Sequence, residues 1–464
     1  MIVVGGGAAG FFAAITCAEG APGTEVILLE KGPQFLSKVR ISGGGRCNVT
    51  HACFDARELA ARFPRGGQAL IGPFQRFQAR DTVEWFESRG VRLKTEEDSR
   101  MFPVSDLSQT IIDCLINVAK KAGVKLVTNC GVEEVRRAGR RTFEPRNGLD
   151  AEGKIEQPLP PHPNPLPWGE GEPLAVLEEK SGSFVSEPTL KSQTSGREGF
   201  ELKLSNGEIL SCERLLLATG GCRTAAMGRL AESLGHTLEP PVPSLFTFHI
   251  EVPWLRDLAG VSVEDVEAAV PGTKLRERGP LLVTHWGLSG PVILRLSAWG
   301  ARELHGSNYK FPLEVNWLPD LDEGAVVDEL DRRRKEQPAR LVVNGPIPPL
   351  RARLWEQLVL PSGIQRETRW AELSRTAQHG LVQQLRRTEF AVTGKSLNKE
   401  EFVTCGGVKL SEVNFKTMES RICPGLHFAG ELLDIDGITG GFNFQAAWTT
   451  GWIAGKAMAR EPAT

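Results

Sequence analysis

The sequence predicts a doubly wound α/β domain of the Rossmann type, into which a β-barrel-like and helical cap domain is inserted. Three observations lead to this fold class. A glycine-rich turn joins a short apolar strand to a helix at the N-terminus, and a second glycine-rich turn opens a helix near the C-terminus. Between them, short apolar runs give way to Glu, Arg and Leu at helical spacing. Because the two glycine-rich turns stand at opposite ends of the chain, we expect a discontinuous nucleotide domain.

Size and composition exclude several classes of protein. The 464 residues allow two or three domains, and a net charge of −2 gives no basic footprint for nucleic acid, so we expect a small-molecule substrate and no nucleic-acid partner. No apolar run approaches the roughly 20 residues that span a bilayer. The nine cysteines form no C-x-x-C pair, and no signal segment precedes the first strand. These features predict a cytoplasmic protein without a metal site, and they leave its oligomeric state open.

The first element is an apolar strand over Met1 to Val4, followed by a glycine-rich turn and an Ala-rich helix. Each glycine of the turn has a physical role. Gly5 permits the tight turn, Gly7 lets the backbone approach a pyrophosphate, and Gly10 lets the helix pack closely on the strand. The phosphates would then meet free N–H groups at the start of the helix. This motif predicts a dinucleotide site without separating FAD from NAD.

The second strand, Glu25 to Leu29, ends at an acidic residue with a predicted role. Glu30 follows Gly10 by twenty residues, the distance at which an acidic side chain bonds the adenosine ribose. A third junction of strand and glycine turn occurs where Leu215 to Leu217 runs into Ala218-Thr219-Gly220. We expect these segments to lie at the same edge of one parallel sheet.

Two further glycine-rich segments predict contact with an anion or a flat ring. Residues 42–50 read Ser-Gly-Gly-Gly-Arg-Cys-Asn-Val-Thr, and three consecutive glycines favour a loop because each costs a helix or strand roughly 0.5–1 kcal/mol. Near the C-terminus, Gly440-Gly441-Phe442-Asn443 precedes a helical run from Gln445 to Ala459. We interpret Asn443 as the N-cap of that helix.

Taken together, these segments resemble a bacterial flavoprotein family, the aminoacetone-oxidase-like (BaiN-type) NAD(P)/FAD-dependent oxidoreductases. The matching stretches are Gly5 to Gly10, Ser42 to Thr50, Ala218 to Gly221, Thr284 to Pro291 and Gly406 to Gly455. The resemblance covers nearly the whole chain apart from residues 137–199. Departures from the family pattern occur at Ser37, Arg40 and Cys405.

The resemblance implies FAD as cofactor, with NADH or NADPH as a transient partner. It places Glu30 on the adenosine ribose and the Val132 backbone on the adenine. It also places Glu431 and Asp434 near the ribityl chain, and N–H groups at the start of the last helix on the flavin's pyrimidine edge. The full set of residues that we expect to bind the cofactor is Gly5, Gly7, Ala8, Ala9, Gly10, Glu30, Lys31, Lys38, Ser42, Gly43, Gly44, Arg46, Cys47, Asn48, Val132, Ala218, Thr219, Gly220, Gly430, Glu431, Asp434, Gly441, Phe442 and Asn443.

Domain boundaries follow from the change in pattern along the chain. We expect the FAD domain in three parts, with a cap domain and an insertion between them: 1–136, 200–242 and 404–464 for the FAD domain, 137–199 for the insertion, 243–318 and 385–403 for a β-rich cap, and 319–384 for a helical lobe. Runs such as Leu245 to Val252 and Val292 to Leu296 are interpreted as cap strands. The insertion is rich in proline, which favours a disordered surface segment, with docking of a proline-binding partner as the alternative.

Two candidate chemical groups remain open to more than one interpretation. His285 lies in a string, Thr284 to Pro291, that the resemblance singles out. Its imidazole suits proton transfer at neutral pH, although a loop histidine held by backbone hydrogen bonds is the alternative. Cys47 and Cys53 suggest a disulfide reductase, but the glycines before Cys47 argue against the helix that such a cysteine pair needs. We interpret Cys47 as a small apolar residue beside the cofactor.

The predicted function is hydride transfer between a small organic substrate and FAD. An NAD(P)H-linked reductase of a C=C or C=O bond is the first interpretation. An oxidase that uses O₂ on an amine or amino-ketone is the second. The third is a flavin-binding protein without turnover, such as a redox sensor or a tRNA-modification accessory protein.

Overall fold

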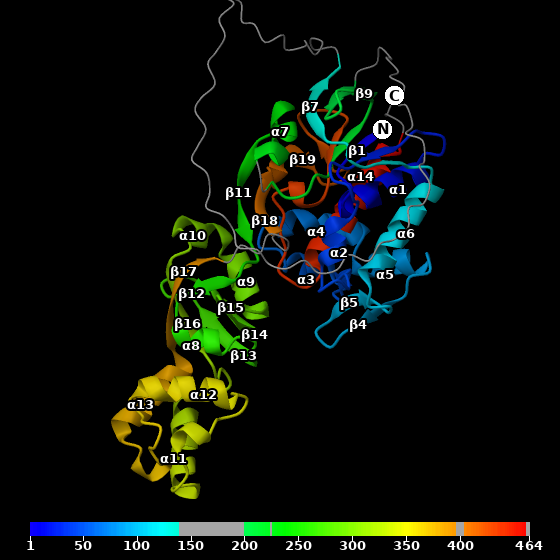
Figure 1. The fold of residues 1–464 in the computed structure, drawn as a ribbon. Helices are drawn as coiled ribbons and strands as arrows, with labels where there is room; N and C mark the ends of the chain where they lie inside the picture. Colours follow the sequence, from blue (N-terminus) through cyan, green and yellow to red (C-terminus); the bar gives the residue numbers. More distant parts are fainter. Residues whose placement is uncertain (139–198, 223–224, 396–402, 461–464) are drawn as a thin grey trace, which may run out of the picture.

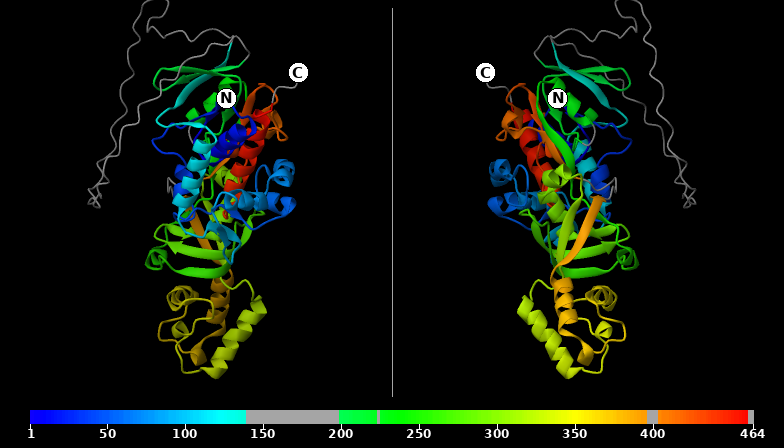
Figure 2. Two further views of the ribbon diagram at one scale, coloured as in Figure 1. Left: turned by 90° about the vertical axis from the view of Figure 1, so that its right-hand side faces the viewer. Right: turned by 90° about the vertical axis from the view of Figure 1, so that its left-hand side faces the viewer.

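A computed structural model describes residues 1–138, 199–222, 225–395 and 403–460, and it confirms the predicted fold class. A nucleotide domain stands at one end of the elongated molecule, a β-barrel lies in the middle and a helical lobe forms the other end (Figures 1 and 2). The first and the last described residues both lie in the nucleotide domain. Most of the predicted insertion, residues 139–198, lies outside the described residues.

The core of the nucleotide domain is a seven-stranded sheet of order β19-β20-β21-β10-β1-β2-β6. Its strands are β1 (Ile2–Val4), β2 (Ile27–Leu29), β6 (Lys125–Val127), β10 (Leu215–Leu217), β19 (Val413–Asn414), β20 (Glu419–Ser420) and β21 (Leu426–Phe428). The five from β21 to β6 are parallel. Every residue of β1, β2, β10 and β21 is buried, as expected for a parallel sheet covered on both faces.

Helices α1 (Ala8–Gly20) and α14 (Phe442–Met458) bring the two ends of the chain together. Two glycines of α14 permit their close approach. A Cβ atom added at Gly451 would lie 2.4 Å from the Ala9 carbonyl oxygen, and one added at Gly455 would lie 2.5 Å from that of Ala13. The nucleotide domain is therefore built from both ends of the sequence.

Smaller sheets and helices complete this domain. One sheet holds β3 (Thr50–His51), β5 (Arg100–Pro103) and β4 (Leu93–Thr95), and another holds β7 (Val132–Arg137), β8 (Phe200–Leu204) and β9 (Ile209–Cys212). The helices are α2 (Ser37–Ile41), α3 (Ala56–Ala60), α4 (Gly67–Arg76), α5 (Ala79–Glu87), α6 (Ser108–Lys121) and α7 (Ala225–Ser233). Strands β11 (Leu238–Ser244) and β18 (Val403–Val408) pair with each other where the chain passes into and out of the barrel.

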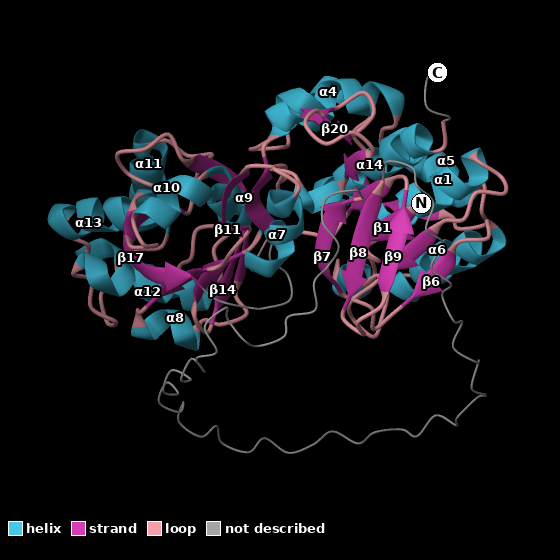
Figure 3. Cartoon of the chain, turned by 90° about the horizontal axis from the view of Figure 1, so that it is seen from above, coloured by secondary structure: helices cyan, strands magenta, loops and turns pink. Residues whose placement is uncertain are grey.

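The barrel is closed, with strand order β12-β15-β14-β13-β16-β17, and it stands beside the nucleotide domain (Figure 3). Its strands are β12 (Phe248–Ile250), β13 (Ser262–Ala269), β14 (Arg276–Thr284), β15 (Gly287–Ser289), β16 (Phe311–Asn316) and β17 (Thr388–Lys395). Its helices are α8 (Pro253–Asp257), α9 (Pro291–Trp299) and α10 (Ala301–Gly306). The lobe between β16 and β17 holds α11 (Glu323–Glu336), α12 (Ala352–Val359) and α13 (Arg375–Arg386).

One predicted strand is wrong. Residues Val292 to Leu296 belong to α9, which begins at Pro291. Proline is favoured at the first position of a helix because its missing N–H would have no partner there. Val292, Ile293 and Leu296 are fully buried in the barrel core. A short apolar run of this kind is compatible with a buried strand as well as with a buried helix. Within the described ranges, no helix combines the length and the apolar character that a membrane crossing requires.

The buried histidine of β21 predicts a pH-dependent stability. Burial lowers the pKa of His427 to about 4, whereas an unfolded imidazole titrates near 6.5. Between these values the unfolded state binds more protons than the folded state, so stability falls as the pH falls. We expect this histidine alone to lower the free energy of unfolding by about 2 kcal/mol between about pH 7 and pH 5. Urea unfolding of the wild type and of His427→Gln at both pH values measures this change in the free energy of unfolding. An equal pH dependence in the two proteins would contradict the prediction.

Candidate functional site

The three glycines of the N-terminal turn have two different roles. At Gly5 and Gly10 a side chain would collide with the protein, whereas Gly7 has open space beside it. Gly5 has a φ of +112°, and an added Cβ atom would lie 2.3 Å from the Ala218 carbonyl oxygen. A Cβ atom at Gly10 would lie 1.9 Å from the Gly5 carbonyl oxygen. At Gly7, the N-cap of α1, a Cβ atom meets nothing within 4 Å. The backbone around the start of α1 is thus accessible to a ligand, as the predicted pyrophosphate site requires.

Glu30 is held in one orientation by the backbone around it. Its carboxylate accepts hydrogen bonds of 2.8 Å from the N–H groups of both Gly6 and Gly32. The Cys130 N–H bonds the Glu30 carbonyl oxygen, which brings the start of β7 at Val132 to the same edge of the sheet. The Lys31 side chain runs along this edge, since a Cβ atom at Gly131 would lie 3.3 Å from its Cγ. The residues predicted to bind adenosine are therefore neighbours.

Four residues of the loop over residues 42–48 have a left-handed backbone. Gly43, Gly44 and Gly45 have φ angles of +57°, +68° and +83°, and Cys47 continues the turn with a φ of +63°. The loop closes on itself through the Cys47 N–H, which donates to the Ser42 carbonyl oxygen at 2.9 Å. Only glycine adopts this conformation at low cost over three consecutive residues.

The cysteines of this region form no disulfide. Cys47 and Cys53 are both free thiols. Cys47 is fully buried, and burial raises the pKa of its thiol to about 12. A thiol of this kind stays protonated and is a poor nucleophile. The structure therefore gives the disulfide-reductase alternative no support.

Asn48 joins the glycine loop to the C-terminal helix. Its side-chain amide donates to the Thr50 carbonyl oxygen at 2.9 Å and accepts from the Gly441 N–H at 3.0 Å. The Trp448 indole N–H also donates to the Val49 carbonyl oxygen, at 2.9 Å. Residues separated by almost 400 positions thus meet at one point, where the start of α14 lies against the loop.

The start of α14 differs from the prediction in one respect. The N-cap is Gly441, with a φ of +92°, and not Asn443. The Asn443 side chain instead bonds the backbone of Gly437, accepting from its N–H at 2.8 Å and donating to its carbonyl oxygen at 2.9 Å. A position that must turn with positive φ favours glycine over asparagine. Since Asn48 takes the Gly441 N–H, the N–H groups of Phe442 and Asn443 remain to face a ligand.

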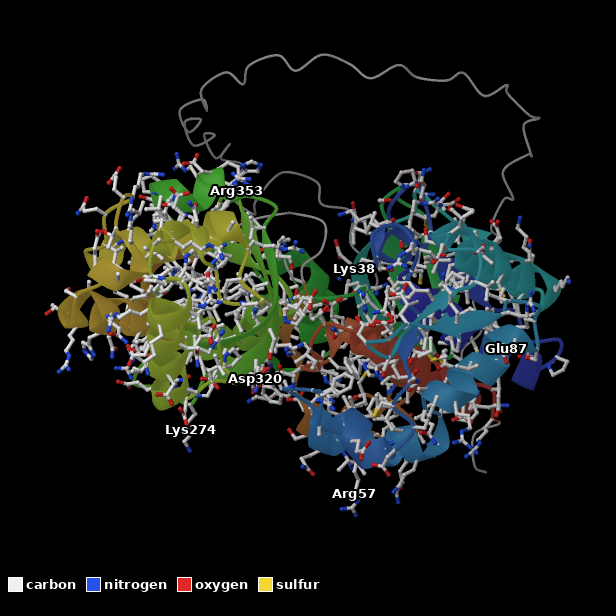
Figure 4. All side chains as sticks on the ribbon, turned by 90° about the horizontal axis from the view of Figure 1, so that it is seen from below. Lys38, Arg57, Glu87, Lys274, Asp320 and Arg353 are labelled. Carbon is white, nitrogen blue, oxygen red and sulfur yellow. The ribbon has the colours of Figure 1, made fainter. Side chains whose placement is uncertain are left out.

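Charged side chains from distant segments meet on the side of this site that faces the barrel. Lys38 pairs with Glu431 at 2.5 Å, and Glu431 also accepts from the Thr404 N–H at 2.9 Å. Lys38 lies on the side of the nucleotide domain that faces the barrel (Figure 4). Arg302 of α10 places one guanidinium nitrogen 3.1 Å from both carboxylate oxygens of Asp434. Both predicted carboxylates therefore have cationic partners.

Two of the predicted site residues, Arg46 and His285, have side chains that are less closely joined to the rest of the site. The Arg46 guanidinium pairs with Glu96 at 2.6 Å and covers the Phe102 ring at 4.0 Å, so its charge is directed to β5 and the loop before it. The imidazole of His285 is exposed in the turn between β14 and β15 and forms no hydrogen bond or ion pair within the described part of the chain. Its neighbour Trp286 is 62% exposed. The structure therefore keeps His285 accessible without joining it to the residues of the cofactor site.

The sequence did not point to a buried polar network that supports the site. The Gln445 side-chain oxygen accepts hydrogen bonds from the hydroxyls of Thr50 at 2.6 Å and Thr82 at 2.9 Å. Arg65 binds the fully buried Asp436 through two nitrogens, one of them 2.6 Å from a carboxylate oxygen. Arg65 also donates to the Ala298 carbonyl oxygen of the barrel helix α9, at 2.5 Å. The only sequence signal was a Gln in a mostly apolar helix and an Asp in a glycine-rich loop.

The residues of this site fit a dinucleotide cofactor such as FAD. The Thr219 hydroxyl is buried and has no partner among the described residues, which suits a position beside a polar ligand. Cβ atoms at Gly44 and Gly220, like that at Gly7, would meet nothing within 4 Å. Together with the N–H groups at the starts of α1 and α14, these positions form a surface of accessible backbone.

Comparisons with known proteins agree with this assignment. The sequence model of the HI0933-like protein Rossmann domain matches residues 1–154, and that of the HI0933-like protein barrel and H2TH domain matches residues 242–403. The two models of this family together cover more than half of the chain.

Curated relatives align over almost their whole length. The chain is 29% identical to a ribosomal RNA dihydrouridine synthase of Escherichia coli, with 98% of this chain and 96% of that protein covered. It is 26% identical to a 3-dehydro-bile acid delta(4,6)-reductase of Clostridium scindens, with 99% of both covered. Among solved structures, a 3-ketosteroid delta1-dehydrogenase from Sterolibacterium denitrificans gives a TM-score of 0.46 at 11% identity, covering 99% of this chain and 98% of that chain.

Proposed function

Because this chain belongs to the HI0933-like family of FAD-dependent oxidoreductases, we propose that it reduces a carbon–carbon double bond next to a carbonyl group. The observation that carries the proposal is the chemistry shared by the names of the two curated relatives described above. Dihydrouridine is uridine with its ring C=C bond saturated, and a delta(4,6)-reductase saturates ring C=C bonds of a keto compound. The two substrates differ greatly in size, so the shared reaction is a better guide than either substrate.

The residues of the site have distinct roles in this proposal. FAD, when bound, supplies the hydride chemistry. The accessible backbone at Gly7 and the start of α1 would hold its pyrophosphate, and Glu30 its adenosine ribose. The N–H groups of Phe442 and Asn443, at the positive end of α14, would stabilise negative charge at the site. Asn48 and Gln445 keep that helix end against the glycine loop.

We further propose that NADH or NADPH is the electron source and leaves after each transfer. The chain carries one glycine fingerprint of the dinucleotide type and no second Rossmann pattern. A nicotinamide would then bind as a substrate, with an affinity on the order of micromolar to millimolar. The free cysteines also favour the cytoplasm as the place of action.

Anaerobic absorbance spectroscopy of the purified, FAD-loaded protein tests this function. We expect NADH or NADPH to bleach the flavin band, and 2-cyclohexen-1-one or uridine-containing RNA to restore it without oxygen. Bleaching by an amine or amino-ketone, followed by reoxidation only with O₂, would replace the proposal with an oxidase. If no reductant bleached the flavin, the protein would be a flavin-binding protein without turnover.

His285 is our proposed proton donor or acceptor. If it transfers the proton that accompanies the hydride, His285→Gln should lower turnover by roughly 10²-fold while FAD stays bound. His379→Gln is the control, since it alters an exposed histidine of α13 in the lobe. Steady-state rates and the flavin-to-protein ratio measure the effect. A variant that loses flavin or unfolds would show that His285 has a structural role.

A further inference from the structure

A hollow of about 350 Å³ lies between the nucleotide domain and the barrel. The nucleotide domain contributes Ala61, Arg62 and Ile438 to its lining, and the barrel contributes Glu277, Arg278, Arg295 and Trp299. Three of these seven side chains are arginines and one is acidic. A ligand in this hollow would therefore meet both domains and a surplus of positive charge.

The arginines of the hollow differ in their partners. Arg295 pairs with Glu277 at 3.1 Å, and Arg278 is held by Asp265 and Asp320, with Nε of Arg278 3.0 Å from Asp265. The Arg62 guanidinium forms no hydrogen bond or ion pair with any residue that the structure describes. Arg62 is thus the cation in the hollow that can bind an incoming anion without breaking an ion pair.

Trp299 places a flat apolar surface beside these charges. It is the last residue of α9 and follows Arg295 by four positions, so the two side chains lie on the same face of the helix. Trp299 is 42% exposed, whereas four other tryptophans of the chain are fully buried. An exposed indole next to a guanidinium suits a ligand that has both a planar ring and a negative charge.

The hollow is adjacent to the predicted flavin site. The Ile438 N–H donates to the Arg62 carbonyl oxygen at 3.0 Å, and Ile438 follows Gly437, which Asn443 binds. His51 stacks on Phe442, the first residue of α14, with ring centroids 4.6 Å apart. Burial and, after it, the charge of Arg62 lower the pKa of His51. The hollow therefore opens near the end of α14 that is predicted to meet the flavin.

We propose that this hollow anchors the substrate, with Arg62 binding an oxyanion and Trp299 stacking on a planar ring. The assignment rests on the proposed function and deepens it, because it implies a substrate with a negatively charged group at a distance from the double bond. A phosphate of a nucleotide and a carboxylate of a small acid offer the same chemistry. The binding experiment described next distinguishes a phosphate from a carboxylate as the bound anion.

Binding to the FAD-loaded protein tests the assignment without turnover. Fluorescence anisotropy measures a fluorescein-labelled oligouridylate, and calorimetry measures cholate. We expect Arg62→Gln, which removes a hydrogen bond to a charged group, to weaken binding of one of these probes by about tenfold. We expect a loss of similar size from Trp299→Leu, which removes the indole ring that packs against the ligand ring. Arg57→Gln removes the same charge from α3, where Arg57 points outward at the edge of the nucleotide domain (Figure 4), and it should leave binding unchanged.

Each outcome decides the assignment. A loss confined to the oligouridylate identifies a nucleotide phosphate, and the dependence of log K on log salt should then fall by about 0.7 in Arg62→Gln. A loss confined to cholate identifies a small carboxylate. Equal losses in Arg57→Gln and Arg62→Gln, or no measurable binding of either probe by the wild type, would overturn the proposal. Because these measurements need no hydride transfer, the reductase function can fail while the anchoring site stands.

Discussion

A Gly7→Val variant is expected to fold but to purify without flavin. The added side chain meets no protein atom, because a Cβ atom at Gly7 has nothing within 4 Å. It would instead occupy the space over the first N–H groups of α1, where a pyrophosphate must approach the backbone. We expect occupancy to fall from about one FAD per chain to below about one in ten. The absorbance of the purified protein measures the occupancy, and circular dichroism measures the fold.

Two further variants make this result specific. Gly72→Val adds the same side chain to an exposed position of α4 that also has nothing within 4 Å, so it should keep its flavin. Gly10→Ala places a Cβ atom 1.9 Å from the Gly5 carbonyl oxygen and should damage the fold itself. If Gly7→Val retained as much flavin as Gly72→Val, the cofactor site would lie elsewhere.

The second large effect is expected at Asp436, where the nucleotide domain is joined to the barrel. Its carboxylate is fully buried, binds Arg65 through both oxygens and accepts from the Ser244 hydroxyl at 2.8 Å. Arg65 in turn holds the Ala298 carbonyl oxygen of α9. Asp436→Asn leaves the Arg65 charge without its buried partner, and breaking such a pair costs about 3–5 kcal/mol.

Chemical denaturation of the FAD-loaded protein measures this loss. Asp98→Asn, which alters an exposed ion pair with Arg100, is the control and should cost less than about 1 kcal/mol. A double variant, Arg65→Met with Asp436→Leu, removes both charges and should recover much of the stability. Equal stability of Asp436→Asn and the wild type would show that the pair does not hold the two domains together.

The sequence predicted the parts of the site that depend on local backbone geometry. Gly5, Gly10 and the three glycines after Ser42 occupy positions that other residues fill only with strain or collision, so their identity reveals the turns. The same reasoning failed where one local sequence pattern is compatible with two kinds of secondary structure. The run Val292 to Leu296 is apolar apart from Arg295, and a buried helix and a buried strand share such a short apolar pattern.

By itself, then, the sequence determined the fold class, the positions of the glycine turns and the position of the acidic residue that follows the second strand. Only the tertiary structure decided which distant residues come together: Asn48 binds the Gly441 backbone, Arg65 pairs with Asp436, and Arg62 and Trp299 line the same hollow. The physical reason is the range of the interactions. Backbone conformation depends on neighbours along the chain, whereas a buried ion pair or a hollow between domains depends on where helices pack hundreds of residues apart.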